Sequence, residues 1–207
     1  MDSLKKRLVV FDLETTNAPE RNYRHEIIEI AAIEIMEGKI SASDAFYSLV
    51  KPPCRIQPHN YRVSGISDDM VRDALVISQV LPKFLDFIGN DPLIAHGMSF
   101  DSRVLNEQTT ALGHNEVSNM LLDTLTLSRK IYKKEKTHSL DAIMQRLGIK
   151  PSIKHRHRAL GDVECTVMVF LKFLEILKQY DITTLEDIDH LCNTDCDIED
   201  FQQFRLF

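Results

Sequence analysis

Apolar and polar residues along this 207-residue chain follow two periods, one typical of strands and one of helices. Three early segments, residues 8–11, 27–35 and 44–50, are β-branched or alternating and predict strands of an antiparallel meander. Residues 92–97 predict a fourth, buried strand. Helical spacing then recurs, and it is longest at residues 159–180, where seven apolar side chains stand at steps of three and four. This order predicts an α/β or α+β domain around a mixed sheet.

Further helices are predicted at residues 78–89, 99–113, 121–132 and 138–148. Residues 51–67 are rich in proline and glycine and predict a long irregular connection, of a kind that is often functional. After residue 180, a short helical segment precedes residues with too little apolar content to fold alone. We therefore predict a main domain at residues 1–180 and an acidic tail at residues 181–207.

The net charge of −6 is unevenly distributed. Residues 181–207 hold eight acids and one arginine, so the rest of the chain is close to neutral. Within that body, positive charge gathers at residues 129–136 and 150–158. Such runs are typical of solvated faces, but here they flank a motif described below and favour contact with phosphates. The overall negative charge therefore does not exclude a nucleic-acid partner.

The four cysteines form no Cys-x-x-Cys pair, which favours free thiols in a reducing compartment. Cys192 and Cys196 stand near His190, so a loosely spaced metal site there is an open alternative. Neither a secretory signal nor a membrane-spanning run is recognisable. We expect a cytoplasmic protein that does not contact membranes.

Four acids stand at the ends or margins of the apolar elements. Asp12 and Glu14 directly follow the first apolar run and, two apart on a strand, face the same way. Asp101 stands where a buried strand passes into a helix, and Asp162 lies in the first turn of the longest helix. Singly, these acids fit helix N-termini or an exposed strand end. Together they predict an oxygen-donor site that suits Mg²⁺ or Mn²⁺ better than zinc.

Three ordered motifs carry a resemblance to a known family. They are "FDLETT" with Asp12 and Glu14, "AHGMSFD" with Asp101, and "HRALGD" with His157 and Asp162. Their residue types and internal spacing resemble those of the DEDDh 3′→5′ exonucleases, of the type found as the proofreading epsilon subunit of bacterial DNA polymerase III. Other segments occur in the matching order, so the likeness spans residues 7 to about 175.

Two positions depart from the family pattern. Asn17 stands where glycine is usual after the two threonines, and Gly97 replaces the asparagine of the second motif. Asparagine tolerates left-handed backbone nearly as well as glycine does. The five residues that the resemblance makes catalytic are all present.

The resemblance implies a ribonuclease H-like fold, a mixed five-stranded sheet flanked by helices. It also implies a 3′→5′ exonuclease that uses two Mg²⁺ or Mn²⁺ ions held by the four carboxylates, with His157 as general base. The substrate would be single-stranded or frayed DNA, cut to nucleoside 5′-monophosphates in proofreading or repair. The sequence does not decide whether the substrate's sugar is deoxyribose or ribose, so an RNA-trimming enzyme such as ribonuclease T is the alternative. A non-catalytic adapter is a second alternative, which the intact catalytic residues disfavour.

Five further residues are candidates for binding the substrate. Thr15 would use its backbone, Ser64 lies in a Val-Ser-Gly-Ile turn, and Phe100 would stack against the last base or, alternatively, pack in the core. Arg156 and Arg158 flank His157 and are candidates for phosphate contact.

The chain ends in Gln-Phe-Arg-Leu-Phe, which resembles the pentapeptide that binds the bacterial sliding clamp. Gln203, Leu206 and Phe207 match that peptide in type and spacing. An extended acidic tether that presents two apolar anchors would suit binding in a groove. The clamp, and a DNA polymerase, are therefore candidate partners; the alternative is a tail that folds back on its own domain.

Overall fold

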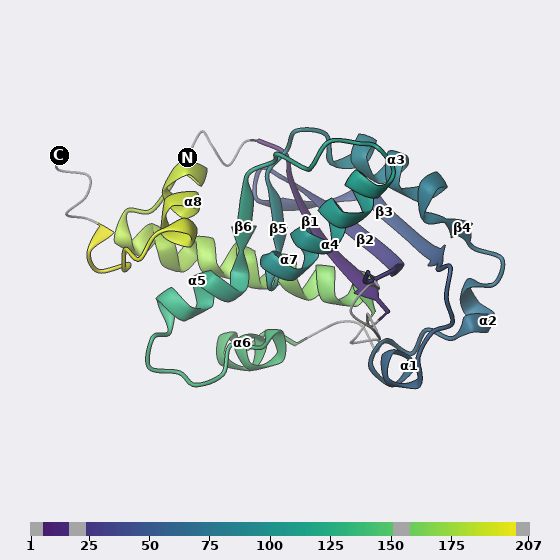
Figure 1. Ribbon diagram of the computed structural model, residues 1–207. Helices are drawn as coiled ribbons and strands as arrows, with labels where there is room; N and C mark the ends of the chain where they lie inside the picture. Colours follow the sequence, from purple (N-terminus) through teal and green to yellow (C-terminus); the bar gives the residue numbers. More distant parts are fainter. Residues whose placement is uncertain (1–5, 17–23, 151–157, 202–207) are drawn as a thin grey trace.

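The computed structural model describes residues 6–16, 24–150 and 158–201 (Figure 1). Its centre is a mixed sheet with the strand order β4-β3-β2-β1-β5-β6. The bounds of the strands are β1 (Leu8–Thr15), β2 (Ile27–Met36), β3 (Lys39–Lys51), β4 (Leu75–Val76), β5 (Leu93–Ala95) and β6 (Leu121–Asp123). The first three strands form the predicted antiparallel meander, and β5 runs parallel to β1. The predicted α/β class is confirmed, and the two-residue β4 raises the strand count above the five expected.

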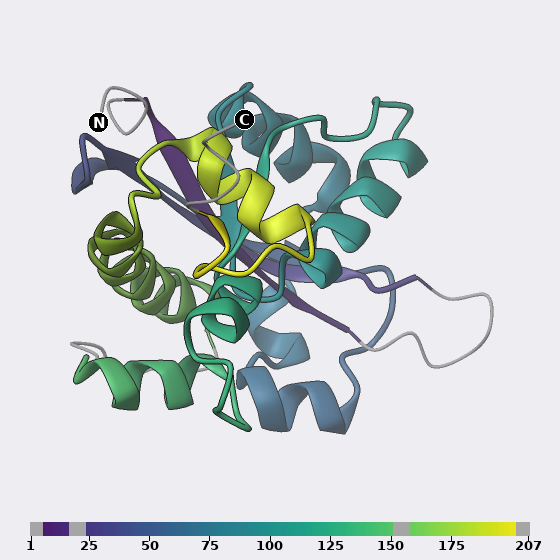
Figure 2. The ribbon, with the colours of Figure 1, turned by 90° about the vertical axis from the view of Figure 1, so that its left-hand side faces the viewer.

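Helices cover both faces of this sheet (Figures 1 and 2). Their bounds are α1 (Pro58–Ser64), α2 (Asp68–Val71), α3 (Ile77–Ile88), α4 (Met98–Ala111), α5 (Thr124–Ile131), α6 (Leu140–Leu147), α7 (Ala159–Leu177), the 3₁₀ turn η2 (Lys178–Tyr180) and α8 (Leu185–Asn193). Helices α3 and α4 share a buried cluster with one face of β1, while α6, α7 and α8 share a second cluster with the other face.

Alternation along β1 decides which layer each side chain enters. Leu8 and Val10 pack in the cluster that contains α7, whereas Val9 and Phe11 pack in the cluster that contains α3 and α4. Successive strand residues face opposite sides, so Asp12 continues the series of Leu8 and Val10. The same face of β1 is therefore apolar along most of its length and acidic at its end, beneath α7.

The predicted irregular connection at residues 51–67 is wrong in part, because α1 lies within it. Pro58 stands at the start of this helix, where its missing N–H costs no helical hydrogen bond. Gly65 ends the helix with a left-handed φ of 69°, which glycine adopts without a Cβ penalty. Ser67 caps the next helix, α2, since its side chain accepts a hydrogen bond from the Met70 N–H.

Residues 181–201 pack on the domain, which differs from the expectation of an acidic tail that begins at residue 181. Helix α8 buries three apolar residues at steps of three, Leu185, Ile188 and Leu191, in the cluster that contains α7. Ile198 and Phe201 are buried in the same cluster. None of the eight acids of this segment is buried, so their number in the sequence masks an apolar stripe that packs in the core. The predicted clamp-binding residues, 203–207, lie outside the described residues.

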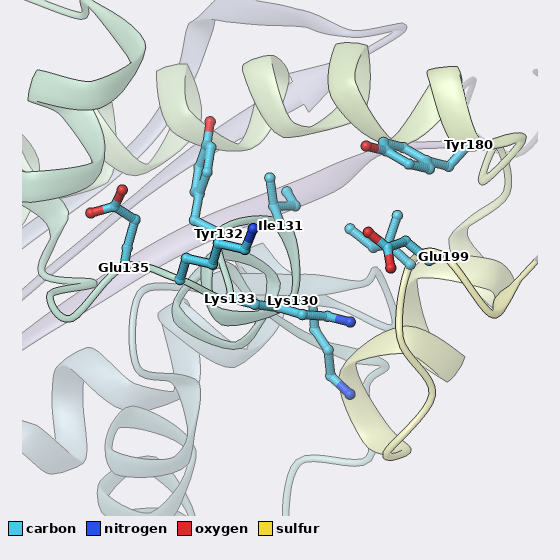
Figure 3. Close-up of a pocket in the computed structure, with 9 residues that line it drawn as sticks. Lys130, Ile131, Tyr132, Lys133, Glu135, Tyr180 and Glu199 are labelled. Atoms are coloured by element: carbon cyan, nitrogen blue, oxygen red, sulfur yellow. The ribbon is translucent and has the colours of Figure 1, made fainter.

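A pocket of about 290 Å³ remains where the end of α5 meets this C-terminal segment (Figure 3). Its lining includes Lys130, Tyr132, Tyr180 and Glu199. The Lys130 ammonium donates hydrogen bonds to the Thr194 and Cys196 carbonyl oxygens at 2.7 and 2.9 Å, so it fastens the segment to α5. Within the described ranges, every helix is too short or too polar to cross a bilayer.

Candidate metal centre and active site

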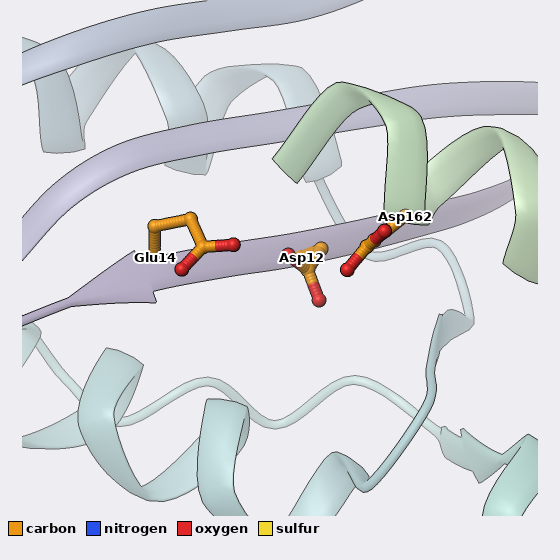
Figure 4. A group of neighbouring side chains, drawn as sticks. All are labelled: Asp12, Glu14 and Asp162. Atoms are coloured by element: carbon orange, nitrogen blue, oxygen red, sulfur yellow. The ribbon is translucent and has the colours of Figure 1, made fainter. Parts of the chain in front are cut away.

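Three of the predicted carboxylates meet at the end of β1 (Figure 4). Asp12 and Glu14 project from β1 and Asp162 from the first turn of α7, and one oxygen of each lies within 4.8 Å of those of the others. All three side chains are partly buried. The meeting follows from the strand period, because Asp12 and Glu14 both face the layer that α7 fills.

Asp101 approaches the same strand end from the first turn of α4. Its side chain is only 5% exposed. Burial and, next, the negative charge of Asp12 raise the pKa of the Asp101 carboxyl well above its usual value, and hydrogen bonding to the backbone of Leu13 and of Asp101 itself opposes the shift. The hydrogen bond to the Leu13 backbone places the Asp101 carboxyl against β1, next to the strand position of Asp12. The oxygens that lie within 4.8 Å of one another are those of Asp12, Glu14 and Asp162.

This donor set fits a divalent cation. Burial raises the pKa of Glu14 to about 9, and the charges of Asp12, Asp162 and Glu29 add to the rise while Arg158 opposes it. The repulsion between these carboxylates is the force that a bound cation relieves. Carboxylate oxygens are the ligands that hard cations such as Mg²⁺ and Mn²⁺ prefer.

The raised pKa of Glu14 makes the stability of the metal-free protein depend on pH. The carboxyl titrates near 4.5 when unperturbed and near 9 in the fold, so the folded state keeps a proton that the unfolded state has lost. This contribution to the free energy of unfolding is present below pH 4.5 and is lost as the pH rises to about 9. With EDTA present, we expect the melting temperature to fall with rising pH more steeply for the unmutated protein than for Glu14→Gln. Equal slopes in thermal melts would contradict the assignment.

The remaining catalytic candidate, His157, lies outside the described residues, as does Arg156. Arg158 is described, and its guanidinium is bound within the protein: Nε donates to both carboxylate oxygens of Glu29 at 3.0 and 3.1 Å, and Nη2 donates to the Tyr47 hydroxyl at 2.9 Å. These contacts compete with the predicted phosphate contact.

The other substrate candidates lie around the end of β1. The Thr15 carbonyl accepts a hydrogen bond from the Asn60 amide at 3.0 Å, which ties α1 to this strand. Ser64 is buried, and its hydroxyl donates to the Asn60 carbonyl and accepts from the Ile66 N–H, so it supports the turn after α1. Phe100 is 37% exposed and lies edge-on to His25, with ring centroids 5.2 Å apart. Core packing, the alternative for Phe100, is therefore not what the structure shows.

Sequence reasoning missed Glu29, the most buried acid near the site. It lies on β2 with no exposed side-chain surface and accepts hydrogen bonds from Arg158, Tyr47 and the Ala159 N–H. The signal available in the sequence is a glutamate inside the apolar run Ile27–Ala32, where an unpaired carboxylate would be costly. Gly97, which departs from the family pattern, has a left-handed φ of 91°, and its N–H donates to the Asp123 carboxylate.

Known proteins define the class to which this fold and site belong. Residues 9–170 match the model of the RNase T family, described as exonuclease, so the chain belongs to that exonuclease family. The family that was predicted from the three motifs is thereby confirmed. The exonuclease family and the acidic cluster together bear out the prediction of a metal-dependent exonuclease domain.

Two relatives named as DNA polymerase III proteins match most of this chain but only a small part of their own length. The chain is 38% identical over 187 residues to a DNA polymerase III of PolC type from Caldanaerobacter subterraneus subsp. tengcongensis, covering 90% of this chain and 13% of that protein. It is 38% identical over 180 residues to a DNA polymerase III subunit epsilon-like protein from Rhodobacter capsulatus, covering 87% of this chain and 25% of that protein. The chain therefore spans only a small part of the length of these relatives.

Solved structures support the ribonuclease H-like fold. Exonuclease X in complex with 5′ overhanging duplex DNA has a TM-score of 0.72 and 25% identity, over 90% of this chain and 99% of that chain. The nuclease domain of 3′hExo, a DEDDh family member bound to rAMP, has a TM-score of 0.70 and 20% identity, over 82% of this chain and 92% of that chain. The second likeness concerns the fold alone.

Proposed function

We propose that this domain removes nucleotides from the 3′ ends of single-stranded or frayed DNA, as nucleoside 5′-monophosphates, in proofreading or repair. The observation that carries the proposal is the convergence of Asp12, Glu14 and Asp162 within 4.8 Å in a chain of the exonuclease family. DNA is favoured over RNA because both relatives named above are DNA polymerase III proteins by name, and because Exonuclease X was solved with DNA. A cytoplasmic location is part of the proposal.

Each carboxylate has a defined part in this proposal. Asp12, Glu14, Asp101 and Asp162 would hold two ions, Mg²⁺ or Mn²⁺. When bound, such ions activate a water and stabilise the departing 3′-oxygen. The burial of Asp101 and the partial burial of the other three carboxylates reduce their contact with bulk water, which strengthens electrostatic interactions at this point.

His157 would take the proton of the attacking water, since histidine has a pKa near the working pH. Phe100 would stack against the terminal base with its exposed ring, a contact that holds single strands without reading their sequence. Thr15, Ser64 and Arg156 stay predicted contacts of the terminal nucleotide.

The deciding experiment compares matched DNA and RNA oligomers labelled at either end, with Mg²⁺ or Mn²⁺ and with EDTA as the control. We expect mononucleotides from 3′-labelled DNA at the first turnover, a ladder from 5′-labelled DNA, and no product in EDTA. A clear preference for RNA would instead establish the RNA-trimming alternative. If the protein releases nothing from any 3′ end with either metal, the adapter alternative is correct.

The terminal peptide is proposed to recruit the domain to a sliding clamp. Two apolar anchors contribute roughly 3–6 kcal/mol of gross burial, reduced by the entropy cost of association, so we expect micromolar affinity. Deleting residues 203–207, or changing Leu206 and Phe207 to alanine, should eliminate clamp binding in a pull-down or titration and lower activity on clamp-loaded primers. Hydrolysis of short free oligomers should stay unchanged. Undiminished clamp binding, or lost activity on free oligomers, would refute recruitment by this peptide.

A further inference from the structure

A buried ion pair lies directly beside the carboxylate cluster. Glu29, on β2, has no exposed side-chain surface, and Arg158, immediately before α7, is 26% exposed at its side chain. The guanidinium binds the carboxylate through Nε and Nη2, and the Tyr47 hydroxyl donates to the Glu29 carboxylate at 2.8 Å. Removing Arg158 would leave the buried carboxylate of Glu29 without an opposite charge, although the Tyr47 and Ala159 donors would remain.

Glu29 also caps the helix that carries Asp162. The cap residue Arg158 makes no side-chain cap hydrogen bond of its own, and the first helical N–H, that of Ala159, donates to the Glu29 carboxylate at 2.8 Å. A negative charge at this position also complements the dipole of α7. The Arg158 carbonyl in turn accepts the Asp162 N–H at 3.0 Å. One carboxylate on β2 thus holds the turn from which Asp162 projects.

The other half of the cluster is linked to the same residue through the sheet. In the antiparallel pairing of β1 with β2, Glu29 is the cross-strand partner of Glu14. Like charges at directly opposite positions destabilise a sheet, and here Arg158 compensates the charge of Glu29. Glu29 therefore contacts both elements of the cluster. It pairs with Glu14 on β1 and binds the first turn of α7, which carries Asp162.

We propose that Glu29, with Arg158 and Tyr47, is a positioning residue of this site, which fixes the first turn of α7 against β2 and so sets Asp162 relative to Asp12 and Glu14. The proposal rests on the metal-dependent hydrolysis proposed above. It assigns Arg158 to the support of the metal ligands rather than to the substrate's phosphates. Such supporting contacts are worth about 10- to 100-fold in metal affinity or activity.

A phosphate contact and a support of the metal ligands are the two possible roles of Arg158, and they predict different kinetic effects of its substitution. Loss of a phosphate contact raises KM and lowers the salt dependence of binding. Loss of a support weakens the cation site and lowers kcat, while the KM for the oligomer stays nearly constant. The test therefore uses Glu29→Gln, which removes charge with little change of shape, and Arg158→Lys, which keeps charge but loses the paired donors.

A matched control exists on the same strands. Arg7 donates to Glu34 on β2 at 2.5 Å and to Asp91 at 2.6 Å, and the side-chain exposures of Arg7 and Glu34 are 23% and 9%. This pair lies at the opposite end of β1, since Glu34 is the cross-strand partner of Val9. Glu34→Gln should lower the melting temperature without weakening the cation site.

The readouts are Mn²⁺ affinity by calorimetry without substrate, kcat and KM on a 3′-labelled oligomer, and the melting temperature. We expect Glu29→Gln and Arg158→Lys to weaken Mn²⁺ binding and lower kcat about 10- to 100-fold with KM little changed. If Glu29→Gln does not fold, Tyr47→Phe carries the test, with an expected loss of about two- to tenfold in Mn²⁺ affinity.

Three outcomes would overturn the proposal. They are a raised KM with unchanged Mn²⁺ affinity in Arg158→Lys, an equal loss of Mn²⁺ affinity in Glu34→Gln, and unchanged Mn²⁺ affinity in every Glu29 or Tyr47 variant that folds. Failure of the proposed function would give a different result. If the unmutated protein binds Mn²⁺ but does not hydrolyse the oligomers, Glu29→Gln should still weaken Mn²⁺ binding.

Discussion

Asp12→Ala is expected to abolish the metal-dependent release of mononucleotides while the protein stays folded. Asp12 interacts with each of the other three carboxylates. It lies in the cluster with Glu14 and Asp162, and its charge raises the pKa of Asp101. Its loss should cost several kcal/mol of transition-state stabilisation, which is a rate loss of about 10³-fold or more. The measurement is the release of labelled mononucleotide with Mg²⁺ or Mn²⁺, together with a circular dichroism melt.

The control for this variant is Asp86→Ala, an exposed acid on α3 outside the cluster, which should retain full activity. Removing one of several mutually repelling carboxylates should also raise the melting temperature of the metal-free protein. Residual activity of Asp12→Ala at the level of the unmutated protein would contradict the proposed metal site. Loss of activity together with loss of the folded spectrum would show that Asp12 supports the fold instead.

His157→Gln is expected to lower turnover by roughly 10²–10⁴-fold while Mn²⁺ binding survives. Histidine accepts a proton only when neutral, so the activity of the unmutated protein should rise from about pH 6 to pH 8 as the imidazole deprotonates. In the variant this rise should be absent. The measurement is kcat across this pH range at saturating metal, with Mn²⁺ affinity determined separately.

His155→Gln provides the matched control, because it removes a histidine two positions away in the same basic run. We expect it to keep both the turnover and the pH profile. If His157→Gln instead loses metal affinity as severely as Asp162→Ala, His157 is a metal ligand and its assignment as general base is wrong.

The strong local patterns of the sequence predicted the main elements of the fold. The apolar run of β1 and the long stripe of α7 extend over enough residues for their periods to identify a strand and a helix without further information. Each of the acids Asp12, Glu14, Asp101 and Asp162 stands at the end or margin of such an element, where a single carboxylate has a local explanation. They were found because all four occur in three ordered motifs with matching spacing. The site could thus be predicted from single chain segments and their order.

Short elements could not be predicted in the same way. The three residues of β6, Leu121–Asp123, lie in a segment whose spacing suggested only a helix, and they become a strand because β5 provides a parallel partner. Helix α1 begins at Pro58 and is followed by Gly65, and both residue types equally mark a loop. The hydrogen bond from Asn60 to Thr15 on β1 holds the helix in place. Elements of this length depend on neighbours that are distant in sequence.

The support around the cluster was decided by tertiary structure alone. Sequence determined that Glu14 and Asp162 are acids at the ends of a strand and a helix, but the contact between Glu29 and Arg158 joins residues 129 positions apart. Only the register of β1 with β2, and the packing of α7 across both, makes Glu29 face Glu14 and cap Ala159. The physical reason is that local periodicity reports which side of an element is buried. Which charged groups meet there depends on how separate elements align.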